Sequence, residues 1–132
     1  MKKHYYIFAS LFLSACSANL SFMPAGDRLD DAQVGKVYSS RITIDGGHVI
    51  HLPDIIPLEP SDSGLLATPC KLPHEKTNKN TRLFVDYNCV DIKGIPVIAG
   101  EIKLNLTGGV IGGMYTKATP FKKVFIIKIK PQ

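Results

Sequence analysis

The chain contains 132 residues, of which 45% are hydrophobic, and its 16 Lys and Arg outnumber its 11 Asp and Glu to give a net charge of +5. This length suits a single domain. Nucleic-acid binding requires Lys and Arg clustered on one face, which this small and dispersed charge does not indicate, so no nucleic-acid partner is expected.

The first residues have the pattern of a secretory signal. A short basic start, residues 1–4, precedes an uncharged stretch, residues 5–13, that is followed by small residues. A helix needs about 20 apolar residues to cross a bilayer, so this stretch is too short for a membrane span. The pattern is typical of a helical signal peptide that is removed from the mature protein.

The end of this signal, Leu13-Ser14-Ala15-Cys16, resembles the lipobox of bacterial lipoproteins. The resemblance implies that residues 1–15 are cleaved off and that Cys16 becomes an acylated N-terminus with membrane lipid as its partner. Several acyl chains hold a protein stably, because each buried methylene contributes about 0.8 kcal/mol. Ser17 is similar to the enterobacterial pattern for export, which implies the periplasmic face of the outer membrane in a Gram-negative host. The alternative is an ordinary secretory signal with a chance cysteine.

Residues 16–31 are predicted to form a flexible tether between the lipid and the domain. They contain turn residues such as Pro24 and Gly26 and no sustained hydrophobic period. The acidic pair Asp30 and Asp31 is expected to be solvated there. The folded domain is expected to cover residues 32–132.

Two cysteines remain once Cys16 carries lipid. Cys70 and Cys89 would then pair with each other, because disulfides persist in exported proteins. Closing a loop of about 20 residues stabilises a fold by roughly 3 kcal/mol in the chain-entropy model. The alternatives are two buried free thiols or a metal pair, although the close CxxC spacing of zinc sites is lacking.

After residue 31 the apolar residues alternate with the period of β-strands. The clearest stretch is residues 101–107, and others cover residues 38–45, 82–90 and 122–130. The residues expected to face the core are Tyr38, Ile42, Ile44, Leu83, Val85, Tyr87, Cys89, Ile102, Leu104, Leu106, Phe125, Ile127 and Ile129. Prolines in residues 48–80 permit only edge or covered strands, and residues 74–80 form a predicted exposed loop. Short strands separated by turns predict an all-β protein with a β-sandwich fold.

Two segments also resemble bacterial Ig-like, cadherin-type domains. In the first, Val34-Gly35 and Tyr38 lead to a Gly-Gly turn at residues 46–47, and in the second, residues 94–100, a Gly-x-Pro-x-x-x-Gly motif precedes the strand at residues 101–107. Residues 63–65 lie near the place of the family's Pro-x-Gly-Leu turn. The resemblance implies an Ig-like antiparallel β-sandwich. The cysteine pair and a predicted glycine-rich hairpin at residues 108–113 depart from the family pattern.

No residue pattern indicates catalysis, a cofactor or a metal. His48 and His51 lie near Asp45 and Asp54, but strand positions three apart point to opposite faces. No Gly-x-Ser-x-Gly nucleophile motif occurs, and residues 108–113 lack the lysine and the helix of a phosphate-binding loop. The glycines there are expected to serve tight turns.

Two functions remain for such a chain. The first is a membrane-anchored, non-catalytic interaction module of the cell envelope that offers a surface or an edge strand to a protein partner. The alternative is a periplasmic inhibitor or immunity-type protective lipoprotein.

Overall fold

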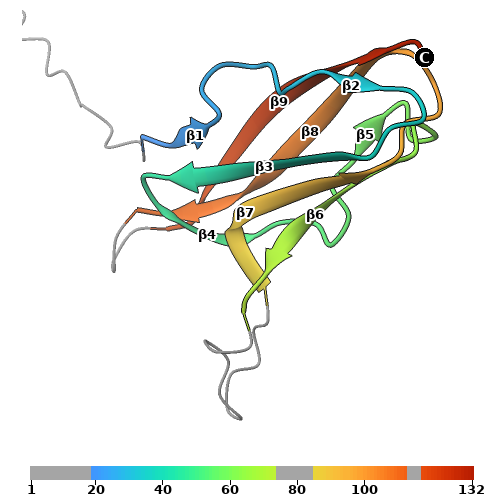
Figure 1. Cartoon of the computed structure of the whole chain (residues 1–132). Helices are drawn as coiled ribbons and strands as arrows, with labels where there is room; N and C mark the ends of the chain where they lie inside the picture. Colours follow the sequence, from blue (N-terminus) through green and yellow to red (C-terminus); the bar gives the residue numbers. More distant parts are fainter. Residues whose placement is uncertain (1–18, 74–84, 113–116) are drawn as a thin grey trace, which may run out of the picture.

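The computed structural model describes residues 19–73, 85–112 and 117–132 (Figure 1). This part of the chain is all-β, and two sheets pack face to face as a β-sandwich. The first sheet has the order β1-β3-β7-β6, and all of its pairings are antiparallel. Its strands are β1 (Ser21–Met23), β3 (Tyr38–Asp45), β7 (Val85–Gly94) and β6 (Leu65–Lys71).

The second sheet has the order β2-β9-β8-β4, and β5 also pairs with β8. The long hairpin of β8 and β9 forms its centre, and the short β2 runs parallel to β9. Its strands are β2 (Ala32–Gln33), β9 (Thr119–Lys130), β8 (Gly100–Ile111), β4 (His48–His51) and β5 (Leu58–Glu59).

The strand order matches that of an immunoglobulin-type sandwich. In that fold a sheet with the order A-B-E-D faces a sheet made of C, F and G. The order β1-β3-β7-β6 corresponds to A-B-E-D, and β4, β8 and β9 correspond to C, F and G. The N-terminal segment contributes to both sheets, first as β1 and then as β2.

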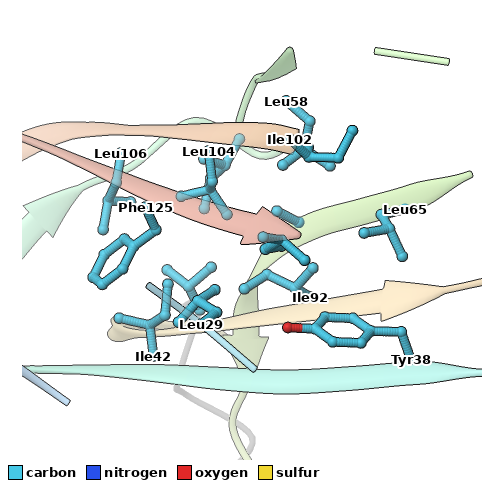
Figure 2. Close-up of a cluster of buried hydrophobic side chains, with 14 of the residues drawn as sticks. Leu29, Tyr38, Ile42, Leu58, Leu65, Ile92, Ile102, Leu104, Leu106 and Phe125 are labelled. Atoms are coloured by element: carbon cyan, nitrogen blue, oxygen red, sulfur yellow. The ribbon is translucent and has the colours of Figure 1, made fainter. Parts of the chain in front are cut away.

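The core lies between the sheets and is formed by the inward residues of both. Figure 2 shows Leu104, Leu106 and Phe125 of one sheet facing Ile42 and Ile92 of the other. The alternation predicted for residues 101–107 and 122–130 is confirmed. The largest fully buried side chains are Phe125, Ile42, Ile44, Leu52, Ile56, Ile92, Ile102, Leu104, Leu106, Ile127, Ile129 and Val49.

The predicted tether is wrong for residues 19–31. Ser21 of β1 pairs with Asp45 at the end of β3, and Phe22 packs against the core. Leu29 is buried, and its backbone N–H donates to the Ile126 carbonyl at 3.0 Å. Single apolar residues among turn residues carry no period, so the pattern does not reveal that they cover the open edge of β9. The folded domain therefore includes residue 19.

The face assignment in β7 is confirmed for Tyr87, which packs against the core, but needs correction at Cys89, and Leu83 lies outside the described residues. Val90 and Ile92 are the fully buried residues of this strand, and Asn88 points inward with them. Cys89 has the opposite parity, pairs with Thr43 and lies outside the core cluster. The reason is an irregularity in the register between β6 and β7. Pro69 pairs with Val90, but the next residue of β6, Cys70, pairs with Asp86.

The predicted glycine-rich hairpin is in part a strand. Gly108 and Gly109 lie inside β8 and pair with residues of β9. A Cβ atom on Gly108 would lie 2.5 Å from the His51 carbonyl oxygen and 2.9 Å from a ring carbon of Phe121. Gly108 is therefore required for close strand packing rather than for a turn. Residue 113 lies outside the described residues.

The proline-rich middle behaves as predicted. β4 and β6 are edge strands, and Pro69 lies within β6. Proline removes a backbone donor, which an edge position tolerates. The predicted loop at residues 74–80 lies outside the described residues. No helix in the described part is long and apolar enough to cross a membrane.

Candidate interaction surface

The two ends of the sandwich lie at different distances along the chain from Cys16, the expected site of the lipid. We call one the anchor pole; it contains Asn19, β1, the turn after Asp45, the end of β8 and the start of β9. The opposite end contains the start of β3, the end of β7 and the start of β8. Figure 1 shows β1 at the left and the C-terminus at the far right, near the second end. Residues close to Cys16 in sequence thus lie at the anchor pole.

Exposed apolar side chains gather at the end opposite the anchor pole. Val37 is 81% exposed, and Val97, Ile95 and Ile98 are 60%, 49% and 42% exposed. Val37 directly precedes Tyr38, which pairs with Gly94, the residue before Ile95. We call Val37, Ile95, Val97 and Ile98 the apolar tip. Contiguous exposed apolar surface marks interaction sites more often than single exposed side chains do.

Backbone hydrogen bonds between three loops hold the apolar tip in place. The Gly35 N–H donates to the Pro96 carbonyl at 2.9 Å, and the Val97 N–H donates to the Ser63 carbonyl at 2.9 Å. Ser63 is fully buried, and its hydroxyl oxygen accepts a hydrogen bond from the Leu65 N–H at 3.3 Å. The tip is therefore a fixed surface and not a set of independent loops.

Two glycines allow these loops to meet. Gly64 has a φ of 88°, and a Cβ atom there would overlap the Ile95 carbonyl oxygen. Gly94 has a φ of 147°, and its Cβ atom would overlap the Gly64 carbonyl oxygen. Side chains are disfavoured at positive φ, so both positions require glycine for conformation and for space.

Beside the tip, the outer face of β6 and β7 carries a charged hollow of about 670 Å³. Lys93 and Asp91 line this hollow. The guanidinium of Arg41, on β3, donates two hydrogen bonds to the Asp91 carboxylate, from Nε at 2.7 Å and from Nη2 at 3.1 Å. This hydrogen bonding by Arg41 is the main cause that holds the pKa of Asp91 below its ordinary value. Leu66 borders this hollow and a smaller apolar hollow lined by Ile55.

The free edge of β6 is poorly suited to pairing with another strand. The hydroxyl of Ser63 accepts from the Leu65 N–H, and the Ala67 carbonyl accepts from the Ile56 N–H at 2.9 Å. Pro69 has no N–H to offer. Strand addition needs free backbone groups along an edge, so a partner at this end would contact side chains. The expectation of an offered edge strand is not supported for β6.

The predicted cysteine pair is confirmed as a disulfide. Cys70 of β6 and Cys89 of β7 are bonded, with their Cα atoms 5.2 Å apart, and both are buried. The two sulfurs and a carboxylate oxygen of Asp91 lie within 4.8 Å of one another, and this is the only metal-compatible group of three found among the described residues. Both sulfurs are part of the disulfide bond, and the Asp91 carboxylate is paired with Arg41. The group therefore cannot act as a thiolate metal site.

The other residues considered from the sequence do not converge on a site. His48 and His51 are both exposed on β4, with the inward Val49 between them. Asp30 and Asp31 are exposed as expected, but Asp31 also pairs with Lys130 at 3.2 Å. Cys16 lies outside the described residues.

Sequence reasoning missed the apolar tip as a surface. The resemblance treats residues 94–100 only as a Gly-x-Pro-x-x-x-Gly motif before the next strand, yet Ile95, Val97 and Ile98 within it are exposed. A signal was present, because Ile95, Val97 and Ile98 stand between Gly94 and Gly100 with Pro96 among them, and such glycine and proline spacing is typical of a loop.

The fold and the surface together define a disulfide-bonded β-sandwich with an exposed apolar end. No protein-family model matches the chain, and no curated protein matches it.

Proposed function

We propose that the protein is a lipid-anchored, non-catalytic interaction module of the cell envelope, and that its apolar tip binds a protein partner. Cys16 carries the lipid in this proposal, and the sandwich of residues 19–132 displays the tip. The Ig-like strand order supports the resemblance to bacterial Ig-like domains. Fold alone does not imply function; the position and the chemistry of the apolar tip are what support this one.

The observation that carries the proposal is the position of the apolar tip opposite the anchor pole. β3 has eight residues and runs from one end to the other, which separates the two by about 26 Å at roughly 3.3 Å per residue. A surface at the far end of an anchored domain is accessible to other proteins. The same four side chains at the anchor pole would have been hidden beneath the domain.

The chemistry of the tip favours a protein partner with apolar side chains. Burial of one Val or Ile side chain contributes about 1.5–3 kcal/mol, and a few such residues at the centre of an interface carry most binding energy. The tip is rigid, because hydrogen bonds tie its loops together. A rigid surface loses little conformational entropy on binding.

Crosslinking in intact envelopes tests this proposal. We expect the natural chain to yield a specific crosslinked protein and the double variant Val37→Asp/Val97→Asp to lose it. Met23→Asp is the matched control, because Met23 is 57% exposed but lies on β1, away from the tip. Both variants should keep the membrane location and the thermal unfolding midpoint of the natural chain within a few degrees.

A crosslinked partner that survives the tip variant and disappears with Met23→Asp contradicts the role of the tip. If the captured partner is a hydrolase or toxin whose activity falls on binding, the protein is an inhibitor that uses this surface. Activity measured on the mixture distinguishes that outcome from a structural assembly.

A further inference from the structure

The described fold begins very close to the proposed lipid. The backbone of Asn19 lies against Gly46, Leu20 packs against the core, and Ser21 is already paired in β1. Two residues, Ser17 and Ala18, separate Cys16 from Asn19. Three peptide steps span at most about 11 Å, so the chain outside the described fold is too short to hold the domain away from the membrane.

We propose that the anchor pole rests against the headgroups of the bilayer that holds Cys16, and that Lys117 and Lys122 contact anionic lipid there. The inference depends on the proposed lipid anchor. In this arrangement the domain lies directly on the membrane and is not held away from it by a flexible stalk. The occupant of this surface is thus a lipid surface rather than another protein.

The residues of the anchor pole fit such a surface. Lys117 and Lys122 are exposed beside the start of β9, and Lys122 pairs with Thr107 near the end of β8. Exposed cations near a bilayer are attracted to anionic headgroups. The described acidic residues here are Asp45, which is exposed, Asp27, which is already paired with a lysine, and Asp86, whose carboxylate accepts a hydrogen bond from the Asn88 N–H at 2.9 Å.

A third lysine of this region serves the fold instead. The ammonium nitrogen of Lys123 lies 2.6 Å from an Asp27 oxygen and is partly buried. It also lies 5.7 Å and 5.4 Å from the ring centroids of Phe22 and Phe125. Such contacts attract the cation to the ring faces. Lys123 is therefore left out of the proposed lipid contact.

This seating fixes the height of the apolar tip. The length of β3 places the tip about 26 Å from the anchor pole. Together with the short link, the tip stands no more than roughly 40 Å from the bilayer surface. The partner of the tip must then be a protein embedded in, or held close to, the same membrane.

Fluorescence quenching on vesicles tests the seating with the full acylated chain. We would label His48→Cys at the anchor pole and Asp62→Cys near the tip; both positions are exposed. The bonded pair Cys70 and Cys89 does not compete for the label. The vesicles contain phosphatidylcholine, phosphatidylglycerol and a lipid with a nitroxide on its headgroup.

We expect the label at residue 48 to be quenched at least threefold more than the label at residue 62. Equal, weak quenching of both labels would overturn the seating. Sedimentation of the vesicles separates this failure from failure of the anchor: a chain that does not sediment lacks the anchor, whereas one that sediments without quenching at residue 48 is anchored but stands away.

Charge reversal tests the lipid contact of the two lysines. Lys117→Glu/Lys122→Glu should lower quenching at residue 48 by half or more on vesicles with phosphatidylglycerol. Lys103→Glu/Lys128→Glu is the matched control, because these exposed residues lie in the half of β8 and β9 away from the anchor pole. Equal quenching of the two double variants at residue 48 would overturn the role of Lys117 and Lys122.

Discussion

The hydroxyl of Tyr38 donates a hydrogen bond of 2.8 Å to the carbonyl oxygen of Asp30. This contact ties the N-terminal segment to the first residue of β3, and burial of the hydroxyl is the main cause that raises the pKa of Tyr38. Leu29 lies beside it in the core, only 5% exposed. The segment before residue 32 is therefore structural, which shortens the link to Cys16.

Replacement of Leu29 tests the structural role of this segment. Leu29→Ala should lower the free energy of unfolding by about 2–4 kcal/mol, because it removes buried methyl groups and leaves a cavity. Urea unfolding measures the change. Met23→Ala is the control, since an exposed side chain should change stability by about 0.5 kcal/mol or less. Equal stability of the two variants would mean that residues 19–31 are a tether and not part of the folded domain.

Asn88 joins the two sheets at the anchor pole. Its amide nitrogen donates to the Ile44 and Gly47 carbonyls at 2.7 and 2.8 Å, and its amide oxygen accepts from the Val49 N–H at 3.0 Å. Asn88→Asp keeps the acceptor and loses both donors. We expect a loss of about 2–4 kcal/mol, because two partly buried carbonyls lose their partners.

The same urea experiment with Asn105→Asp provides the control for Asn88. Asn105 is half-buried on β8, and no side-chain hydrogen bond of this residue is found in the described part. Its replacement should change stability by less than about 1 kcal/mol. If Asn88→Asp is no more damaging than Asn105→Asp, the bridging role of Asn88 is wrong.

The ion pair of Arg41 and Asp91 should give stability an acid dependence. The pKa of Asp91 is lowered in the fold from an ordinary value of 3.8. Its contribution is therefore present above pH 3.8 and is lost as the pH falls below this value toward the folded pKa. Asp91→Asn should reduce stability by about 0.5–1 kcal/mol at pH 7 and by less at pH 3.

Stability curves of the natural chain and Asp91→Asn across this pH range measure the effect. Glu101→Gln is a suitable control, because its longer contact with Arg28, 3.4 Å, is exposed on both sides. The difference between natural chain and Asp91→Asn should narrow in acid. A difference that stays constant with pH would mean that the charge of Asp91 contributes nothing.

The disulfide should contribute stability of its own. Reduction of the Cys70–Cys89 bond, which closes a sequence separation of 19 residues, is expected to lower the free energy of unfolding by about 3 kcal/mol. The double variant Cys70→Ala/Cys89→Ala should resemble the reduced chain and should not respond to reductant. Identical unfolding of the natural chain with and without reductant would contradict this expectation.

The strongest sequence signals predicted the core of the fold. Alternation at Ile102, Leu104 and Leu106 persists over a whole strand, so one face must be buried wherever the strand lies. The buried face of β7 could not be predicted from alternation in the same way, because the register of its pairing with β6 is irregular, and that irregularity depends on both strands. Asn88 was missed because its partners lie about 40 residues away in sequence and because one of them, Val49, belongs to the other sheet.

The N-terminal segment and the apolar tip escaped prediction for opposite reasons. Leu29 is a single apolar residue among polar ones, and only the presence of β9 shows what it covers. Val97 belongs to the motif at residues 94–100, which carries no prediction of exposure, and the turns at Gly64 and Gly94 leave its side chain in solvent. Hydrophobic periodicity indicates which face of a strand is buried, but it gives no information about isolated apolar residues.

We propose above all that Cys16 is acylated and anchors the sandwich, with the tip directed away from the membrane. Intact-mass measurement of the mature chain from the membrane fraction tests it most directly. We predict a chain that begins at Cys16 and carries the added mass of its acyl groups, and a Cys16→Ala variant that folds but leaves the membrane fraction. A mature chain that begins elsewhere, or that begins at Cys16 with no added mass, would contradict the account.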